Sequence, residues 1–140
     1  DASTALPTAG LLAQVEVRAL MARAISADSL DQIRTLWQEH ARDCVTRGSH
    51  PSLMKMARAC ATHGDHELAI EILEELAAHH IDQKTRKHYE LAATTLVALR
   101  DLYKQTELEL GWGDFFAILK ETTSSLKSLH EEFDRQGLSA

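Results

Sequence analysis

The chain has 140 residues, of which 44% are hydrophobic, 26% charged and only 5% aromatic. These values are typical of one soluble domain with a core of moderate size. Six glycines, two prolines and no asparagine leave few of the residues that tight β-turns need. The composition therefore argues against a fold of many strands and favours long helices.

Charge and hydropathy disfavour two further classes of protein. The net charge of −6 disfavours general nucleic-acid binding, because affinity for a duplex comes largely from neutralising its phosphates. Charged residues or histidine interrupt every apolar stretch before it reaches the roughly 20 residues that cross a bilayer.

Cys44 and Cys60 resemble small buried hydrophobes rather than a disulfide framework. We therefore expect a reducing intracellular compartment, the cytoplasm or an organelle matrix such as that of the mitochondrion.

Residues 1–10 are small, polar and aperiodic, so we interpret them as a flexible arm before a single helical domain over 11–140. The first helix is expected to end near Ala27. Its predicted apolar face contains Leu12, Val15, Ala19, Ala22 and Ser26. Asp28 or Ser29 then provides an N-cap for a second helix that ends before Gly48.

Pro51 is suited to a first helical turn, so a third helix is predicted from Ser49-His50-Pro51 to Gly64. A fourth helix follows Asp65, with Leu68, Ala69, Ile72, Leu73 and Leu76 on its buried face.

The C-terminal part is predicted to form a long helical hairpin. A fifth helix starts at Asp82 and continues without Gly or Pro to Gly111, a length of roughly 40 Å at the helical rise. Gly111-Trp112-Gly113 is expected to be a turn. A sixth helix then carries an apolar stripe that includes Phe115, Leu119, Thr122, Leu126, Leu129 and Phe133. We expect the fifth helix to cover this stripe and to leave Trp112 exposed at the tip.

A weak internal repeat relates the first helix pair to the second. Asp28, Ile33 and Leu36 precede Asp65, Ile70 and Leu73 by 37 residues each, and both sets follow a helix and a short break. A period of about 33 to 47 residues with two helices is typical of solenoids. The expected fold is all-α, a short solenoid of antiparallel helical hairpins with about six helices.

The segment from His50 to Leu76, and more broadly 50–82, resembles a tetratricopeptide or pentatricopeptide repeat. The resemblance centres on Gly64-Asp65 followed by Ala69-Ile70 and Leu73. It implies that Gly64-Asp65 turns between two helices and that the small Ala69 lets them approach closely. The segment 129–139 is similar to the tail of a pentatricopeptide unit.

Eight histidines suggest a metal site, for which the cluster around His63, Asp65 and His66 with His79-His80 is the densest. Helical rise separates the two ends of the cluster by about 20 Å, so one ion could not use them all. Cys44 and Cys60 lie on predicted apolar faces rather than on an exposed turn. No glycine-rich phosphate loop is present. We therefore assign no catalytic residue, cofactor or metal, and expect that the protein is not an enzyme.

Two features are candidates for contact with a partner. Lys84, Arg86 and Lys87, with His88, form the only basic cluster and could contact an acidic partner or a phosphate. Trp112 lies beside two glycines, and Trp is enriched in interface hot spots. Trp37, by contrast, is expected in the core.

The leading hypothesis is a non-enzymatic protein–protein interaction adaptor, or a structural subunit of a larger complex, whose groove binds protein. One alternative is an RNA-associated, pentatricopeptide-like factor of an organelle, which would depend on Lys84, Arg86 and Lys87. Met54 stands at the base-reading position that the resemblance implies, and methionine offers no hydrogen bond to a base edge. A third possibility is a small metal-dependent helical hydrolase that uses His63, Asp65 and His66.

Overall fold

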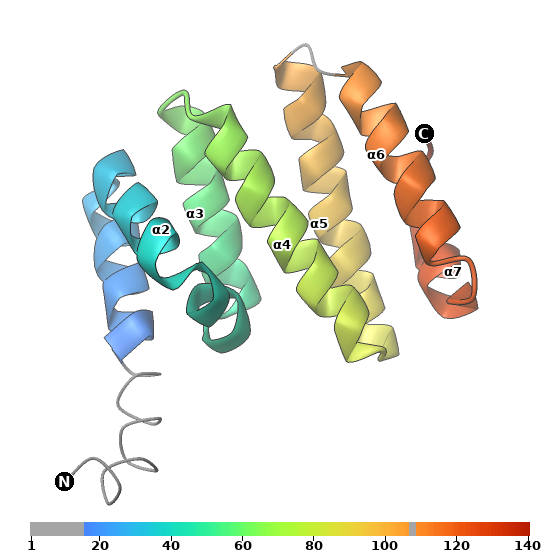
Figure 1. The fold of residues 1–140 in the computed structure, drawn as a ribbon, viewed down its shortest axis with the longest axis horizontal. Coiled ribbons are helices and arrows are strands. Elements are labelled where there is room, and N and C mark those ends of the chain that lie inside the picture. Colours follow the sequence, from blue (N-terminus) through green and yellow to red (C-terminus); the bar gives the residue numbers. More distant parts are fainter. Residues whose placement is uncertain (1–15, 107–108) are drawn as a thin grey trace, which may run out of the picture. The chain divides into compact units, whose positions relative to one another are not determined.

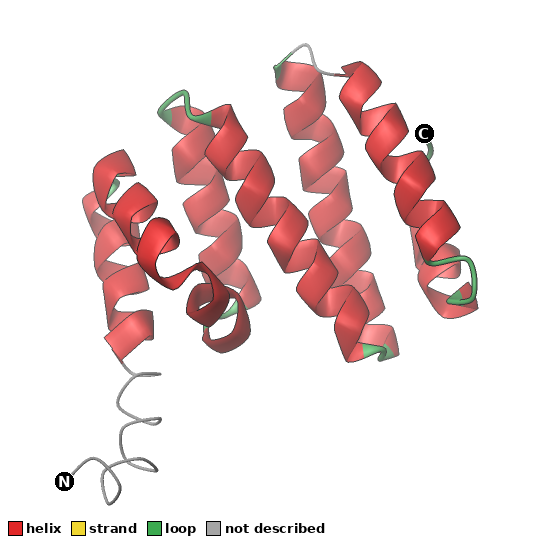
Figure 2. Cartoon of the chain, in the orientation of Figure 1, coloured by secondary structure: helices red, strands yellow, loops and turns green. Residues whose placement is uncertain are grey.

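The computed structural model describes residues 16–106 and 109–140, and every regular element in these ranges is an α-helix (Figures 1 and 2). The all-α prediction is confirmed. Within the described ranges no helix is long and apolar enough to cross a membrane. The chain divides into two compact units, Asp1–Asp65 and His66–Ala140. The single domain expected over 11–140 stays a prediction.

The first unit contains three successive helices: one over 16–27, α2 (Leu30–Arg47) and α3 (His50–Thr62) (Figure 1). The first helix and α2 are antiparallel, because Arg18 Nε donates to the carbonyl of Arg47 at 2.7 Å. Helices α2 and α3 are antiparallel too. Arg34 in the first turns of α2 forms an ion pair of 2.9 Å with Asp65, which follows α3.

Serine caps fix where α2 and α3 begin, and Ser29 is one of the two caps that the sequence offered for α2. The Ser29 hydroxyl accepts a hydrogen bond from the backbone N–H of Gln32, and the Ser49 hydroxyl accepts one from that of Ser52. Each bond satisfies an N–H that has no partner within the helix. Pro51 occupies the first turn of α3, where its missing N–H costs nothing.

The apolar face predicted for the first helix is wrong. Val17, Met21 and Ala24 are buried, whereas Ala19, Ala22 and Ser26 are exposed. Leu12 and Val15 lie outside the described residues. The two faces compete, and the one with larger apolar side chains at i, i+4 and i+7 is buried because it removes more apolar surface from water.

The second unit contains α4 (His66–Gln83), α5 (Arg86–Gln105), α6 (Glu109–Thr122) and α7 (Lys127–Arg135) (Figure 1). Tyr103, near the end of α5, lies 6.3 Å from Trp112 of α6, centroid to centroid. Arg86, at the start of α5, pairs with Glu131 of α7. The chain therefore returns antiparallel along α5. The large buried core of this unit includes Ile72, Leu76, Leu96, Leu99, Phe116, Leu129 and Phe133.

The fifth helix is shorter and the sixth more broken than the sequence predicted. Helix α5 has 20 residues and starts after the N-cap Thr85. The expected sixth helix is divided into α6 and α7 by a turn over 123–126. The Thr122 and Thr123 hydroxyls both donate to the carbonyl of Leu119, and hydroxyls that bind the backbone in this way weaken helix continuation. Leu129 and Phe133 of the stripe are buried, Leu126 is half-buried and Thr122 is exposed.

Candidate partner-binding surfaces

A groove of about 350 Å³ lies between the first helix and α2 in the first unit. Its apolar surface comes from Leu20 and Ala24 of the first helix and from Leu36 of α2. The remaining lining residues are Arg23, Asp31, Gln32, Thr35, Glu39 and His40. Residues of α2 that are four apart share one helix face, so the groove follows α2 from Asp31 to Glu39 for roughly 12 Å.

Polar residues flank the apolar part of the groove, and their charges differ on its two sides. Helix α2 contributes the carboxylates of Asp31 and Glu39, whereas the first helix contributes the guanidinium of Arg23. The side chain of Asp31 is 94% exposed, so its partial pairing with Arg34 at 3.4 Å leaves it accessible from solvent. The α2 side of the groove therefore favours a cationic group on a ligand.

Helix α2 is kinked where the groove ends. His40 has φ −137° and ψ 28°, which are not helical values. Its ring is half-exposed, with Nε2 4.0 Å from the Glu39 carboxylate. Since a kink displaces the helical segments on either side of it, His40 limits the length of regular helix along which a ligand could lie.

The predictions of an exposed Trp112 and of a turn at Gly111–Gly113 are both wrong. These residues lie inside α6, which begins at Glu109, and only 5% of Trp112 is exposed. Its indole stacks on Phe116 one helical turn later, and its Nε1–H donates to the carbonyl of Ser139 at 2.9 Å. A tertiary contact favours glycine at position 111, because a Cβ there would lie 3.2 Å from the Tyr103 ring. Trp112 is therefore a core residue.

The predicted basic cluster lies where the chain passes from α4 to α5, and its members differ in exposure and in ion pairing. Arg86 is an ion-pair partner of Glu131 at 3.1 Å and of the buried Glu132 at 3.5 Å. Lys84, in the linker, and Lys87, in the first turn of α5, are exposed. Arg86 therefore forms ion pairs within the second unit, whereas Lys84 and Lys87 are exposed on its surface.

The histidines of the predicted metal cluster have different surroundings. His63 Nε2 lies 3.1 Å from a carboxylate oxygen of Asp28, and Asp65 accepts a hydrogen bond from Arg34. His80 is 4% exposed, and its Nδ1 lies 2.9 Å from Nδ1 of His88. Among the residues that the structure describes, no group of three or more His, Cys, Asp or Glu side chains could hold a metal ion.

The two cysteines are buried thiols, as expected. Burial raises the pKa of the Cys44 thiol to about 11, with a smaller contribution from the carboxylate of Asp43. Burial also raises the pKa of Cys60 to about 11, and the nearby Asp65 carboxylate adds to the effect. Because the thiolate is the nucleophile, neither cysteine is activated near neutral pH.

Comparison of the chain with protein-family models, with curated proteins and with solved structures found no match. Its function has to be inferred from the geometry of its own residues.

The groove residues are not among the residues that the sequence singles out. A usable signal was the polar set Asp31, Thr35 and Glu39, which repeats every four residues beside the apolar set that contains Leu36. The other wall could not be predicted, because apolar spacing favours a face of the first helix that the structure does not bury. With Met21 and Ala24 on the buried face, Leu20 lies beside that face, and Leu20 and Ala24 both line the groove.

Proposed function

We propose that the protein is a non-enzymatic interaction adaptor, or a structural subunit of a larger complex, that binds a protein segment in the groove of its first unit. The observation that carries this proposal is the groove itself, with the half-buried Leu20 beside the buried Ala24 and Leu36 and polar residues around them. Sites for protein segments combine apolar anchor positions with a polar rim in this way.

The chemistry of the rim favours one kind of segment. An apolar side chain above Leu36 and Ala24 would lose contact with water, while Lys or Arg beside it would lie near Asp31 and Glu39. A helix with apolar residues at i and i+4 and basic residues on the flank facing α2 meets both conditions. Both carboxylates are on the rim, so they contribute more to specificity and association rate than to affinity.

The high thiol pKa values of Cys44 and Cys60 support a role without nucleophilic catalysis by cysteine. We also propose, on the repeat and the resemblance in the sequence, that the chain is a helical-hairpin repeat protein of tetratricopeptide or pentatricopeptide type. In such proteins stacked hairpins offer grooves to protein segments.

The proposal can be tested with two synthetic amphipathic peptides of equal length, both with leucine along one helical face. One peptide has lysine beside the leucines and the other has glutamate. Calorimetric titration of the full chain should show binding of the lysine peptide at least about tenfold tighter than that of the glutamate peptide. The double variant Asp31→Asn, Glu39→Gln should remove this preference.

Two tryptophan substitutions on α2 separate the groove from the rest of the helix. Thr35→Trp should fill the groove and weaken binding, whereas Gln38→Trp, at an exposed α2 position outside the lining, should not. Equal binding of both peptides to wild type and to Thr35→Trp would contradict the proposal. Salt-sensitive binding of single-stranded RNA that is lost in Lys84→Gln, Lys87→Gln would instead support the organellar RNA factor.

A further inference from the structure

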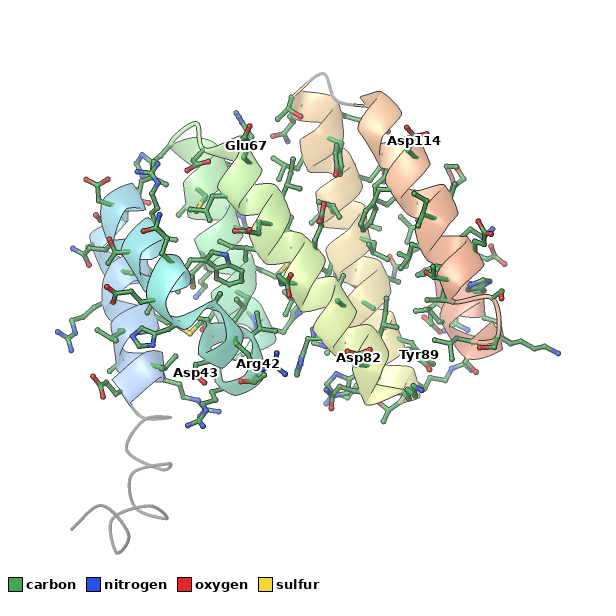
Figure 3. The ribbon with its side chains drawn as sticks, viewed as in Figure 1. Arg42, Asp43, Glu67, Asp82, Tyr89 and Asp114 are labelled. Atoms are coloured by element: carbon green, nitrogen blue, oxygen red, sulfur yellow. The ribbon has the colours of Figure 1, made fainter. Side chains whose placement is uncertain are left out.

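Three histidines lie close together where a short linker joins α4 to α5 in the second unit. The Nδ1 atoms of His80 and His88 are 2.9 Å apart. The ring of His79 lies 5.8 Å from that of His80 and 6.4 Å from that of His88, centroid to centroid. Figure 3 marks this end of the unit with Asp82 on α4 and Tyr89 on α5. Because His80 is on α4 and His88 on α5, their bond joins the two helices.

The number of protons on the pair decides whether this bond exists. A hydrogen bond between two imidazole nitrogens needs one N–H and one lone pair, which two neutral rings, or one neutral and one cationic ring, can supply. If both rings are cationic, each Nδ1 carries a proton and no lone pair remains. The bond is then lost, and two positive charges face each other across about 3 Å. At this distance even strong screening by solvent leaves a repulsion.

The surroundings within the second unit make the doubly cationic state costly. Only 4% of His80 is exposed, so its charged form would be poorly hydrated. The linker and the first turn of α5 add the positive charges of Lys84, Arg86 and Lys87. Asp82 of α4 provides a negative charge, whereas the Glu131 and Glu132 carboxylates of α7 are paired with Arg86.

His79 responds to pH in the same direction. Burial lowers the pKa of His79, the positive charge of His88 lowers it further, and Asp82 partly offsets both effects. A histidine whose pKa is lowered by folding binds a proton more readily in the unfolded chain. Its contribution to stability is present above the ordinary value of 6.5 and is lost as pH falls through the folded-state value.

We propose that the His80–His88 pair is a pH-sensitive latch, which holds the linked ends of α4 and α5 together near neutral pH and opens more often on mild acidification, because each ring can take up a proton once the pair has opened. The linker also favours opening, because Lys84 has the left-handed value φ 55°. This conformation is strained for a residue other than glycine. Release would expose the last turn of α4 and the first turn of α5. This behaviour does not depend on the groove of the first unit.

Hydrogen exchange of the full chain tests the latch, with a chelator present so that no metal ion bridges the imidazoles. Protection factors of the Lys84 and Tyr89 amides, which donate to Ile81 and Thr85, should fall about tenfold between about pH 7.5 and pH 5.5. His88→Asn offers hydrogen-bonding groups that do not titrate and should make this pH dependence smaller than in wild type. His130→Asn, at another half-buried histidine of the same unit, should retain it.

Unchanged protection of wild type across this pH range would overturn the proposal, as would a decrease in His88→Asn equal to that of wild type. A second measurement keeps the proposal testable if His88→Asn fails to fold. The nuclear coupling between the two ¹⁵N-labelled Nδ1 atoms, transmitted through their hydrogen bond, should be present near neutral pH. Absence of this coupling near neutral pH would contradict the hydrogen bond on which the latch depends.

Discussion

The indole of Trp112 stacks on the ring of Phe116, with centroids 5.1 Å apart and planes inclined by 17°. The contact lies within α6, on a face where Phe116 also meets Phe133 of α7 at 5.2 Å. Trp112 therefore helps to hold the last two helices against each other. This relationship replaces the exposed, partner-binding Trp112 that the two flanking glycines had suggested.

We predict that Trp112→Ala lowers the free energy of unfolding by about 3 to 5 kcal/mol, because it empties a large buried volume and removes the hydrogen bond to Ser139. Urea denaturation followed by circular dichroism measures the change. The matched control is Ile118→Ala on the same helix, where the side chain is 62% exposed and the expected change is within about 0.5 kcal/mol. Equal midpoints for wild type and Trp112→Ala would contradict this assignment.

A second prediction concerns Glu132, a carboxylate that is 1% exposed and lies 2.6 Å from Arg135 and 3.5 Å from Arg86. Replacing both arginines by methionine should cost about 3 kcal/mol, because a buried carboxylate would remain without a counter-charge. Either arginine can partly compensate for the other, so each single replacement should cost less than half of this. Adding Glu132→Gln to the double variant should restore most of the stability in denaturant titrations. If it restores none, the arginines stabilise the unit by packing and not by charge.

The third prediction is a pH dependence at Glu74. Burial raises the pKa of Glu74, the neighbouring carboxylates of Glu75 and Glu71 raise it further, and the hydrogen bond from Tyr103 lowers it. The folded chain thus holds this proton more tightly than the unfolded chain. The resulting stability is present below the ordinary value of 4.5 and is lost as pH rises through the folded-state value.

Glu74→Gln cannot ionise and still offers an oxygen to the Tyr103 hydroxyl. Its melting temperature should exceed that of wild type at neutral pH, and the difference should shrink as pH falls towards 4.5. The exposed Glu90→Gln serves as control and should follow wild type at every pH. A constant offset between Glu74→Gln and wild type would show that titration of Glu74 is not the cause.

The fourth prediction is about Gly48, at the end of α2. A Cβ at this position would collide with the carbonyl oxygen of Cys44 and lie 2.8 Å from the sulfur of Met21. The Met21 side chain can move, but the backbone carbonyl cannot. Gly48→Ala should therefore cost about 1 to 3 kcal/mol in thermal or urea unfolding.

Gly64→Ala is the comparison for Gly48→Ala, because Gly64 has open space around it and only its φ of +87° opposes a side chain. The expected cost there is about 1 kcal/mol. The reverse order of the two costs would show that backbone conformation outweighs crowding at these turns.

Local chemistry made much of the fold predictable. Ser29 and Ser49 accept hydrogen bonds from backbone N–H groups at their helix starts, and Pro51 fits only near a helix start, so these signals depend on a few adjacent residues. The Leu138 N–H donates to the carbonyl of Phe133 after Gly137, which has a φ of +72°, and glycine is the residue type that most often ends a helix in this way.

Other features depend on tertiary contacts and could not be read from neighbouring residues. Gly111 looked like a turn residue, although its role is to leave room for Tyr103. His88 belonged to a basic cluster in the sequence, and only the antiparallel return of α5 brings it to His80. Two histidines separated by eight residues across a short helix–helix linker were a usable signal for that pair. The hydroxyl-rich run over 122–125 was a usable signal for the break between α6 and α7, although apolar spacing continues through it.

The measurement that tests the central claim most directly is the location of the lysine peptide on the ¹⁵N-labelled full chain by amide chemical-shift mapping. We predict shifts concentrated at the groove residues Leu20, Ala24, Thr35, Leu36 and Glu39. The same titration of Thr35→Trp should give much smaller shifts at the groove positions, and Gln38→Trp should reproduce wild type. Shifts confined to Lys84 and Lys87, or no saturable shifts, would contradict binding of a protein segment in the groove.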